Sequence, residues 1–258
     1  MSYLELPKKT FRVYQGDCLA LLQRMPEQSI DMILCDLPYG MTNCKWDSVL
    51  PLEELWKLYN RVAKERAAIV LTSSQPFTSN LVMSNIKHFR YEWIWEKAVV
   101  SNFQLSKKMP LKVHEEICVF YRAAPTYNPQ NLVRLETPRK SNNKSRVESK
   151  LGHFHTWNAN YLSEWAEYPS SIIRFKVEKR GLHPTQKPIM LMQYLIRTYT
   201  KEGDLVLDNC MGSGTTGIAA LTTGRRFVGM ELDEKYYSMA RKQLTKLRNW
   251  GALPESKA

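Results

Sequence analysis

The sequence predicts an α/β protein built on a mostly parallel sheet. Short β-rich segments alternate with amphipathic segments over residues 11–121 and again over 189–247. Repeated β-α-β order places strands parallel, with helices on both faces of the sheet. The composition, 43% hydrophobic and 24% charged, is typical of a globular chain. At 258 residues, one large domain with an inserted segment can bury about three-quarters of the surface of its unfolded chain.

The first half is predicted to hold five strands and three helices. Strands are expected over residues 11–14, 30–35, 67–71, 91–95 and 117–121. Helices are expected over residues 18–24, 51–62 and 77–86. The second helix is the best supported, because Pro51 suits a first helical turn and the apolar residues after it recur at helical spacing.

The regular pattern stops between residues 126 and 181. Within this segment, residues 134–150 hold six basic residues and two glutamates, a local net charge of +4. The segment is therefore interpreted as an inserted basic region. Beyond it, helices are expected over residues 189–199, 215–221 and 234–247, and strands over 205–207 and 226–230. The resulting division is 1–125, 126–182 and 183–258.

Charge and cysteine content narrow the classes of function. The net charge of +12 favours a polyanionic partner, although a basic surface can serve solubility alone. Five cysteines without a close pair predict neither a disulfide framework nor a metal knuckle, and indicate a reducing cytosol. No apolar stretch approaches the roughly 20 residues that a bilayer crossing needs, so no membrane association is expected.

A turn of small residues follows the predicted strand at 205–207. It reads Asp208-Asn-Cys-Met-Gly-Ser-Gly-Thr215 and lets a ligand approach the backbone closely. Such turns are common, but Glu231 ends the next strand, where doubly wound folds place a carboxylate for ribose hydroxyls. Together they favour a site for a nucleoside-containing cofactor.

A second motif, Asp36-Leu37-Pro38-Tyr39-Gly40, directly follows the strand at 30–35. A carboxylate, a rigid proline and an aromatic ring at a strand end can hold a planar heterocycle that presents an amino group. An ordinary strand-to-loop turn is the alternative for this motif taken alone.

Together the two motifs resemble those of the β-class DNA amino-methyltransferases, which use S-adenosylmethionine and carry a D-P-P-Y motif before the glycine-rich motif. Three further segments match that family in the same order: Gly16-Asp17-Cys-Leu, His183-Pro-Thr185-Gln-Lys187-Pro, and Gly224 to Glu231. The resemblance spans about residues 11 to 240 and implies a Rossmann-like methyltransferase sheet with permuted motif order. Leu37 replaces the family's first proline and removes one backbone restraint.

The resemblance also implies roles for individual residues. Asp36 and the Leu37 carbonyl would accept the two N–H bonds of the target amine, Pro38 would stiffen the loop, and Tyr39 would stack on the flipped base. The residues expected to bind S-adenosylmethionine are Asp17, Thr185, Lys187, Asp208, Gly212, Ser213, Gly214, Thr215 and Glu231. The residues expected to bind DNA are Lys107, Lys108, Arg139, Lys140, Lys144 and Arg146. No metal site is expected.

Aspartate at position 36 favours N6 of adenine as the target, with N4 of cytosine as the alternative. RNA or a protein amide as substrate, and a non-enzymatic DNA-binding module, are more distant alternatives. The implied partner is double-stranded DNA in the cytoplasm. The sequence leaves open whether the chain forms a homodimer or has a cognate restriction endonuclease.

Overall fold

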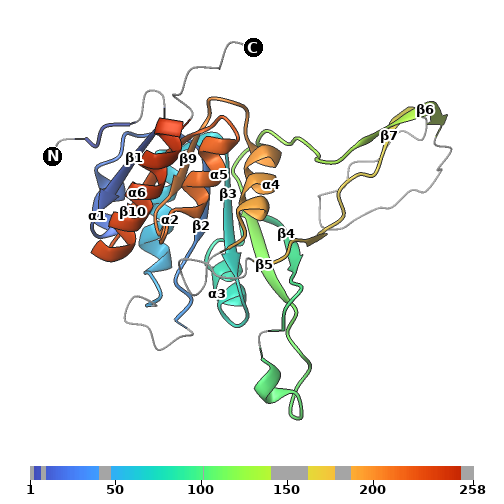
Figure 1. Cartoon of the computed structure of the whole chain (residues 1–258), viewed down its shortest axis with the longest axis horizontal. Coiled ribbons are helices and arrows are strands. Elements are labelled where there is room, and N and C mark those ends of the chain that lie inside the picture. The colour runs from blue at the N-terminus through green and yellow to red at the C-terminus, as the bar shows by residue number, and fades with distance from the viewer. Residues whose placement is uncertain are drawn as a thin grey trace. The chain divides into compact units, whose positions relative to one another are not determined.

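The computed structural model describes residues 3–6, 10–40, 48–100, 102–140, 162–177 and 187–250. Two compact units divide the chain: residues 1–128 with 171–258 form the larger one, and residues 129–170 the smaller one. The larger unit is a single twisted sheet with helices on both faces (Figure 1). This architecture confirms the predicted α/β class.

The main sheet is mostly parallel. Its strands, in spatial order, are β1 (Phe11–Gln15), β10 (Arg226–Glu231), β9 (Leu205–Asp208), β2 (Ile30–Asp36), β3 (Ala63–Ser73), β5 (His114–Phe120), β4 (Phe89–Glu96) and β8 (Ile172–Arg174). All neighbours pair in parallel except β5, which is antiparallel to both β3 and β4. The strands from β1 to β3, together with β4, therefore end at the same edge.

Burial on both faces explains why the central strands consist of apolar runs. On β2, Ile33 and Cys35 pack into one hydrophobic core, whereas Met32 and Leu34 pack into the other. A strand covered by helices on both sides has no polar face and therefore shows no alternation. The covering helices are α1 (Cys18–Gln23), α2 (Leu52–Val62) and α3 (Phe77–Ser84) on the first face, and α4 (Ile189–Tyr199), α5 (Thr215–Thr222) and α6 (Glu234–Trp250) on the second.

In its described part, the segment expected to be irregular contains three strands. In the smaller unit, β6 (Val133–Lys140) pairs antiparallel with β7 (Leu162–Ala166). β8 lies within the range 126–182 that was expected to be an insertion, but it pairs with β4 in the main sheet. Among the helices of the described residues, none is long and apolar enough to cross a membrane.

Candidate active site

The first half of the site lies where β1 and β10 end side by side. Gln15 is paired with Glu231 in the parallel register, and the Gly16 N–H donates to the Glu231 carbonyl at 2.9 Å. Asp17 follows directly and caps α1, its Oδ1 accepting the Ala20 N–H at 2.9 Å. The Gly-Asp motif and Glu231, more than two hundred residues apart in sequence, are thus neighbours in the fold.

The small-residue turn contacts the side-chain carboxylate of Glu231. Gly212 and Gly214 have φ values of 52° and 88°, which L side chains rarely adopt. The Gly212 N–H donates to Glu231 Oε2 and the Asp233 N–H to Oε1, each at 2.8 Å. Burial raises the pKa of Glu231 above its usual range, although these donors oppose the shift. The turn then leads into the N-terminus of α5, a favourable position for a negatively charged group.

Asp208 lies between the two halves of the site. It ends β9, is only 2% exposed, and accepts the Cys210 N–H at 3.0 Å. Burial raises its pKa to about 7, and the negative charge of Asp36 on the neighbouring strand adds to the shift. A buried carboxyl with this pKa changes its protonation state near neutral pH.

The second half of the site is the loop after β2. The Tyr39 hydroxyl donates to Asp36 Oδ1 at 2.7 Å, and the Thr72 hydroxyl, from the adjacent strand β3, donates to the same oxygen. The Tyr39 ring stacks on Phe77 with centroids 5.3 Å apart. Leu37 is buried in the core, so packing restrains the backbone where the related motif has a proline.

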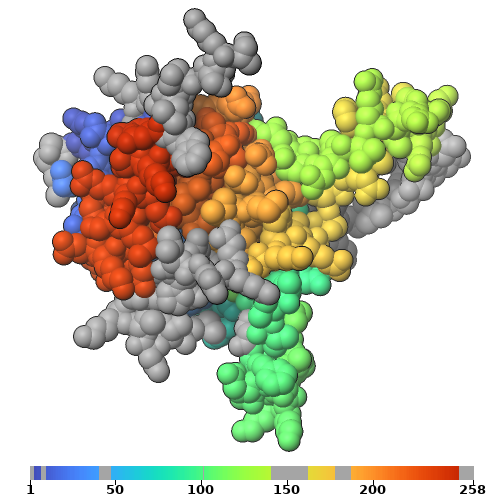
Figure 2. Space-filling model, in the orientation of Figure 1, coloured from blue at the N-terminus to red at the C-terminus, as the bar shows by residue number. Residues whose placement is uncertain are grey.

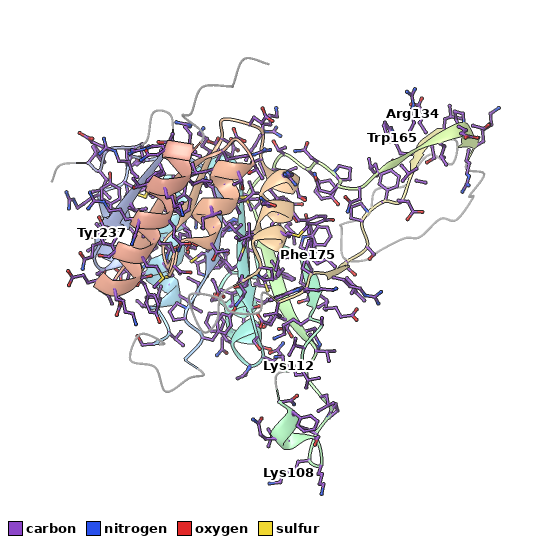
Figure 3. The ribbon with its side chains drawn as sticks, in the orientation of Figure 1. Lys108, Lys112, Arg134, Trp165, Phe175 and Tyr237 are labelled. Atoms are coloured by element: carbon purple, nitrogen blue, oxygen red, sulfur yellow. The ribbon has the colours of Figure 1, made fainter. Side chains whose placement is uncertain are left out.

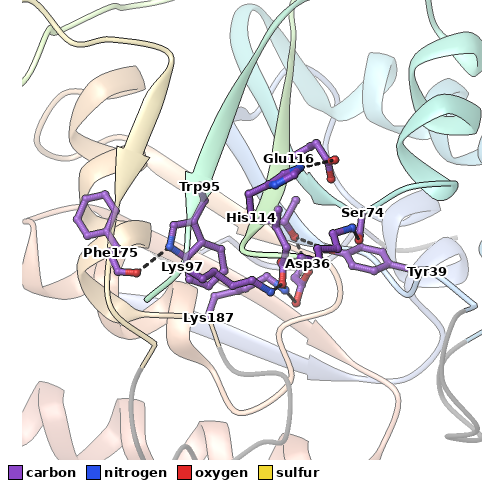
Figure 4. Close-up of polar contacts among 12 residues, drawn as sticks. Asp36, Tyr39, Ser74, Trp95, Lys97, His114, Glu116, Phe175 and Lys187 are labelled. Carbon is purple, nitrogen blue, oxygen red and sulfur yellow. Dashed lines mark hydrogen bonds and ion pairs between the residues drawn. The ribbon is translucent and has the colours of Figure 1, made fainter. Parts of the chain in front are cut away.

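Lys187 forms ion pairs beside this loop. Its ammonium lies 2.9 Å from Asp36 Oδ2 and 3.2 Å from Glu115 Oε2, and Glu115 Oε1 in turn pairs with Lys97 at 2.7 Å (Figure 4). Burial alone would lower the pKa of Lys187, but the two carboxylates raise it above its usual value. Lys187, which the resemblance assigns to the cofactor, pairs in the structure with two protein carboxylates, because α4 begins beside the end of β2 and the start of β5.

The model of the DNA methylase family of N6 and N4 methyltransferases matches residues 30–242. The chain belongs to this family. M.BglI of Bacillus subtilis, a type II methyltransferase, is 42% identical over 308 residues, covering 94% of this chain and 87% of the relative. The DNA adenine methyltransferase YhdJ of Escherichia coli K12 is 25% identical over 255 residues, covering 93% and 84%.

Two crystal structures share the fold of this methylase. M1.HpyAVI in complex with SAM is 23% identical with a TM-score of 0.62, covering 91% of this chain and all of the other. The cytosine-N4-specific PvuII DNA methyltransferase is 17% identical with a TM-score of 0.66, covering 95% of each chain. They support the predicted Rossmann-like methyltransferase sheet.

The residues expected to contact DNA fall in two separate places in the methylase. Lys107 and Lys108 lie on the connection between β4 and β5, whereas Arg139 and Lys140 end β6 in the smaller unit, and all four are exposed. Three of the expected site residues lie outside the described residues: Lys144, Arg146 and Thr185.

Thr72 and Glu115 complete the polar network around Asp36 and were not predicted from the sequence. Thr72 is directly beside Asp36 in the β2–β3 register, and Glu115 lies near the start of β5. The run from Glu115 to Glu116 at the start of an otherwise apolar strand was the available signal, because buried carboxylates require a partner. The partners of Glu115 are Lys97 and Lys187, and they could be identified only once β5 was placed between β3 and β4.

Proposed function

We propose that this methylase transfers a methyl group from S-adenosylmethionine to the N6 amino group of adenine in double-stranded DNA. One observation carries the proposal: the Asp36 loop and the turn from Asp208 to Gly214 follow neighbouring strands, β2 and β9, at one edge of the sheet. In an open parallel sheet, ligands bind outside the carboxyl ends of the strands. A base held at the first loop would face a methyl donor held at the second.

The catalytic residues act on the lone pair of the target nitrogen. An exocyclic amine is a weak nucleophile because its lone pair is delocalised into the ring. Asp36 and the Leu37 carbonyl accept its N–H bonds, which localises the lone pair and stabilises the positive charge that grows during transfer. Tyr39 stacks on the flipped base, and Pro38 together with the buried Leu37 side chain keeps the loop ordered.

The cofactor residues fit the parts of S-adenosylmethionine. Glu231 accepts the ribose hydroxyls, and Asp17, one strand away, accepts the adenine amino group. The methionine part lies along the turn, where Asp208 faces its ammonium and a group of turn residues contributes backbone and hydroxyl groups: Gly212, Ser213, Gly214 and Thr215. Thr185 is assigned to the methionine carboxylate, whereas Lys187 is assigned to Asp36.

Adenine is favoured over cytosine by the aspartate at position 36 and by the adenine activity named for YhdJ. The cytosine-N4 specificity named for the PvuII enzyme keeps N4 of cytosine as the second candidate. Nucleoside mass spectrometry of DNA from a methylation-free host expressing the chain separates them. N6-methyladenine is expected, and N4-methylcytosine without N6-methyladenine would overturn the choice of base.

DNA contacts are assigned to the cations of the β4–β5 connection and of the smaller unit: Lys107, Lys108, Arg139, Lys140, Lys144 and Arg146. These supply phosphate contacts, which position a duplex without reading its sequence. The same proposal includes a cytoplasmic location, which cell fractionation tests. It also includes a homodimer, which light scattering tests, and a cognate restriction endonuclease, which restriction of unmodified host DNA tests.

Replacement of Asp36 tests the catalytic assignment. Asp36→Ala is expected to lower the rate of methyl transfer by about a thousandfold, the loss typical of a removed charge-stabilising group. Calorimetry is expected to show nearly unchanged S-adenosylmethionine binding, because Asp36 lies on the base side of the site. Asp36→Asn serves as the isosteric comparison and should retain more activity. Full methylation by Asp36→Ala would refute the assignment.

A further inference from the structure

The connection between β4 and β5 forms a projecting hairpin, residues 97–113, which includes the short 3-10 helix η1 (Phe103–Leu105). Because β4 runs parallel to β3, the hairpin leaves the sheet at the edge where the Asp36 loop lies. It stands clear of the sheet and the helices of its unit (Figures 1 and 2). Lys108 lies at the far end of the projecting hairpin and Lys112 at its root (Figure 3).

The projecting hairpin combines exposed apolar side chains with positive charge. Phe103 is 70% exposed, Met109 48% and Leu105 39%. The same segment contains four lysines and no acidic residue. Exposed apolar groups of this size indicate a contact with a partner, and the uniform charge indicates that the partner is anionic.

Polar contacts connect the root of the projecting hairpin to the catalytic loop. Lys97 pairs with Glu115, which shares Lys187 with Asp36. On the returning chain, the Lys112 ammonium donates to the hydroxyl of Ser74, just after β3. The exposed apolar residues Phe103, Leu105 and Met109, here called the apolar tip, therefore project from a root that is fixed next to the base-binding residues.

We propose that the apolar tip of the projecting hairpin enters the DNA duplex beside the target base and fills the space that the flipped base leaves, while Lys107 and Lys108 bind the flanking phosphates. Apolar wedges stabilise unstacked steps in this way, and lysines neutralise phosphates without regard to sequence. This inference rests on the proposed function, since it requires a base that leaves the duplex.

Two matched DNA substrates test the wedge. Once the modified site is known, methylation is measured on the fully paired duplex and on a duplex with an abasic site opposite the target base, where opening costs less. The double variant Phe103→Ser/Leu105→Ser is expected to lose about tenfold or more in rate on the paired duplex. On the abasic duplex it should retain activity within about threefold of the wild type. Both replaced side chains are exposed, so the fold should be preserved, and calorimetry with S-adenosylmethionine checks this.

Charge variants of the same hairpin are the control. Lys107→Gln/Lys108→Gln should weaken binding to both duplexes equally and reduce the salt dependence of log K by about two. An equal loss of rate by the Phe103/Leu105 variant on both duplexes would refute the wedge. Light scattering that shows a dimer for the wild type and a monomer for this variant would also overturn the proposal, by assigning the tip to a second copy of the chain. Absence of methylation of either duplex by the wild type would instead overturn the proposed function.

Discussion

Asp36 binds three protein groups at once: the hydroxyls of Tyr39 and Thr72 on one oxygen and the ammonium of Lys187 on the other. The carboxylate is therefore oriented before any substrate arrives. Preorganised groups contribute most to transfer reactions because they need little rearrangement in the transition state. Among the described residues Oδ2 accepts from Lys187 alone, so this oxygen keeps a second lone pair that can accept the target amine.

Lys187 is expected to act as a positioning residue on Asp36. Lys187→Met should lower the turnover rate for methyl transfer by about 10- to 100-fold. S-adenosylmethionine affinity, measured by calorimetry, should change by less than about twofold, because no cofactor residue contacts this ammonium among those described. Lys187→Arg preserves the charge and should restore part of the rate. A loss of cofactor affinity as large as the loss of rate would indicate that Lys187 binds the cofactor and does not position Asp36.

Asp208 should make cofactor binding depend on pH. Burial raises its pKa to about 7, so the carboxyl is neutral below this pH and charged above it. Under the proposed role, the ammonium of the methionine part binds the charged form, so affinity for S-adenosylmethionine should rise from pH 6 to pH 8 and then level off. Binding should release protons, which calorimetry in buffers of different ionisation enthalpy measures. Asp208→Asn should bind with no such dependence, and a flat wild-type profile would contradict the role.

The raised pKa of Asp208 also affects the stability of the free protein. The folded protein retains this proton to higher pH than the unfolded chain does, so the contribution is favourable below the unfolded pKa. It is lost as the pH rises through about 7. Thermal unfolding of wild type and Asp208→Asn at pH 6 and pH 8 should therefore show a stability gain from the substitution that is larger at pH 8. An equal gain in stability at pH 6 and pH 8 would show that other titratable groups determine the pH dependence of stability.

At the scale of elements, the β6–β7 hairpin is expected to contribute DNA affinity and nothing to cofactor binding. Arg139→Gln/Lys140→Gln should weaken duplex binding about tenfold at low salt, and adding Lys144→Gln and Arg146→Gln should weaken it further. Glu136→Gln, on the same strand, is the control and should not weaken binding. Fluorescence anisotropy with labelled duplex measures each effect. Equal loss of S-adenosylmethionine binding would mean that the segment is structural.

Sequence patterns predicted the elements of the main sheet other than β8, because the central strands are buried on both faces and their helices carry continuous apolar stripes. The exposed strand β6 was missed, since nearly all its residues face solvent and it contains Pro138, which disfavours a strand. In the site, Asp36, Asp208 and Glu231 were predicted because each ends a parallel strand. The Lys187–Glu115 pair was not, because it depends on the antiparallel placement of β5, which no linear motif encodes.

At the scale of the whole molecule, the net charge of +12 should appear as steep salt dependence of DNA binding. If the six cations assigned to DNA each neutralise one phosphate, the slope of log K against log salt is about −5.4. Affinity should then fall roughly 1,800-fold between 50 and 200 mM salt. The contributing residues are Lys107, Lys108, Arg139, Lys140, Lys144 and Arg146. Anisotropy titrations measure the slope. A slope near zero would indicate that the positive charge serves solubility and not DNA binding.

The pairing of β1 with β10 affects how the chain folds during its synthesis. β1 leaves the ribosome early, yet β10, its partner among the described strands, follows roughly 200 residues later. At about 5–20 residues per second, this delay is about 10–40 s. During that time β2 also lacks its neighbour β9, so a hydrophobic strand edge stays unpaired. The nascent methylase is therefore most exposed to aggregation and chaperone binding just before its glycine-rich turn is made.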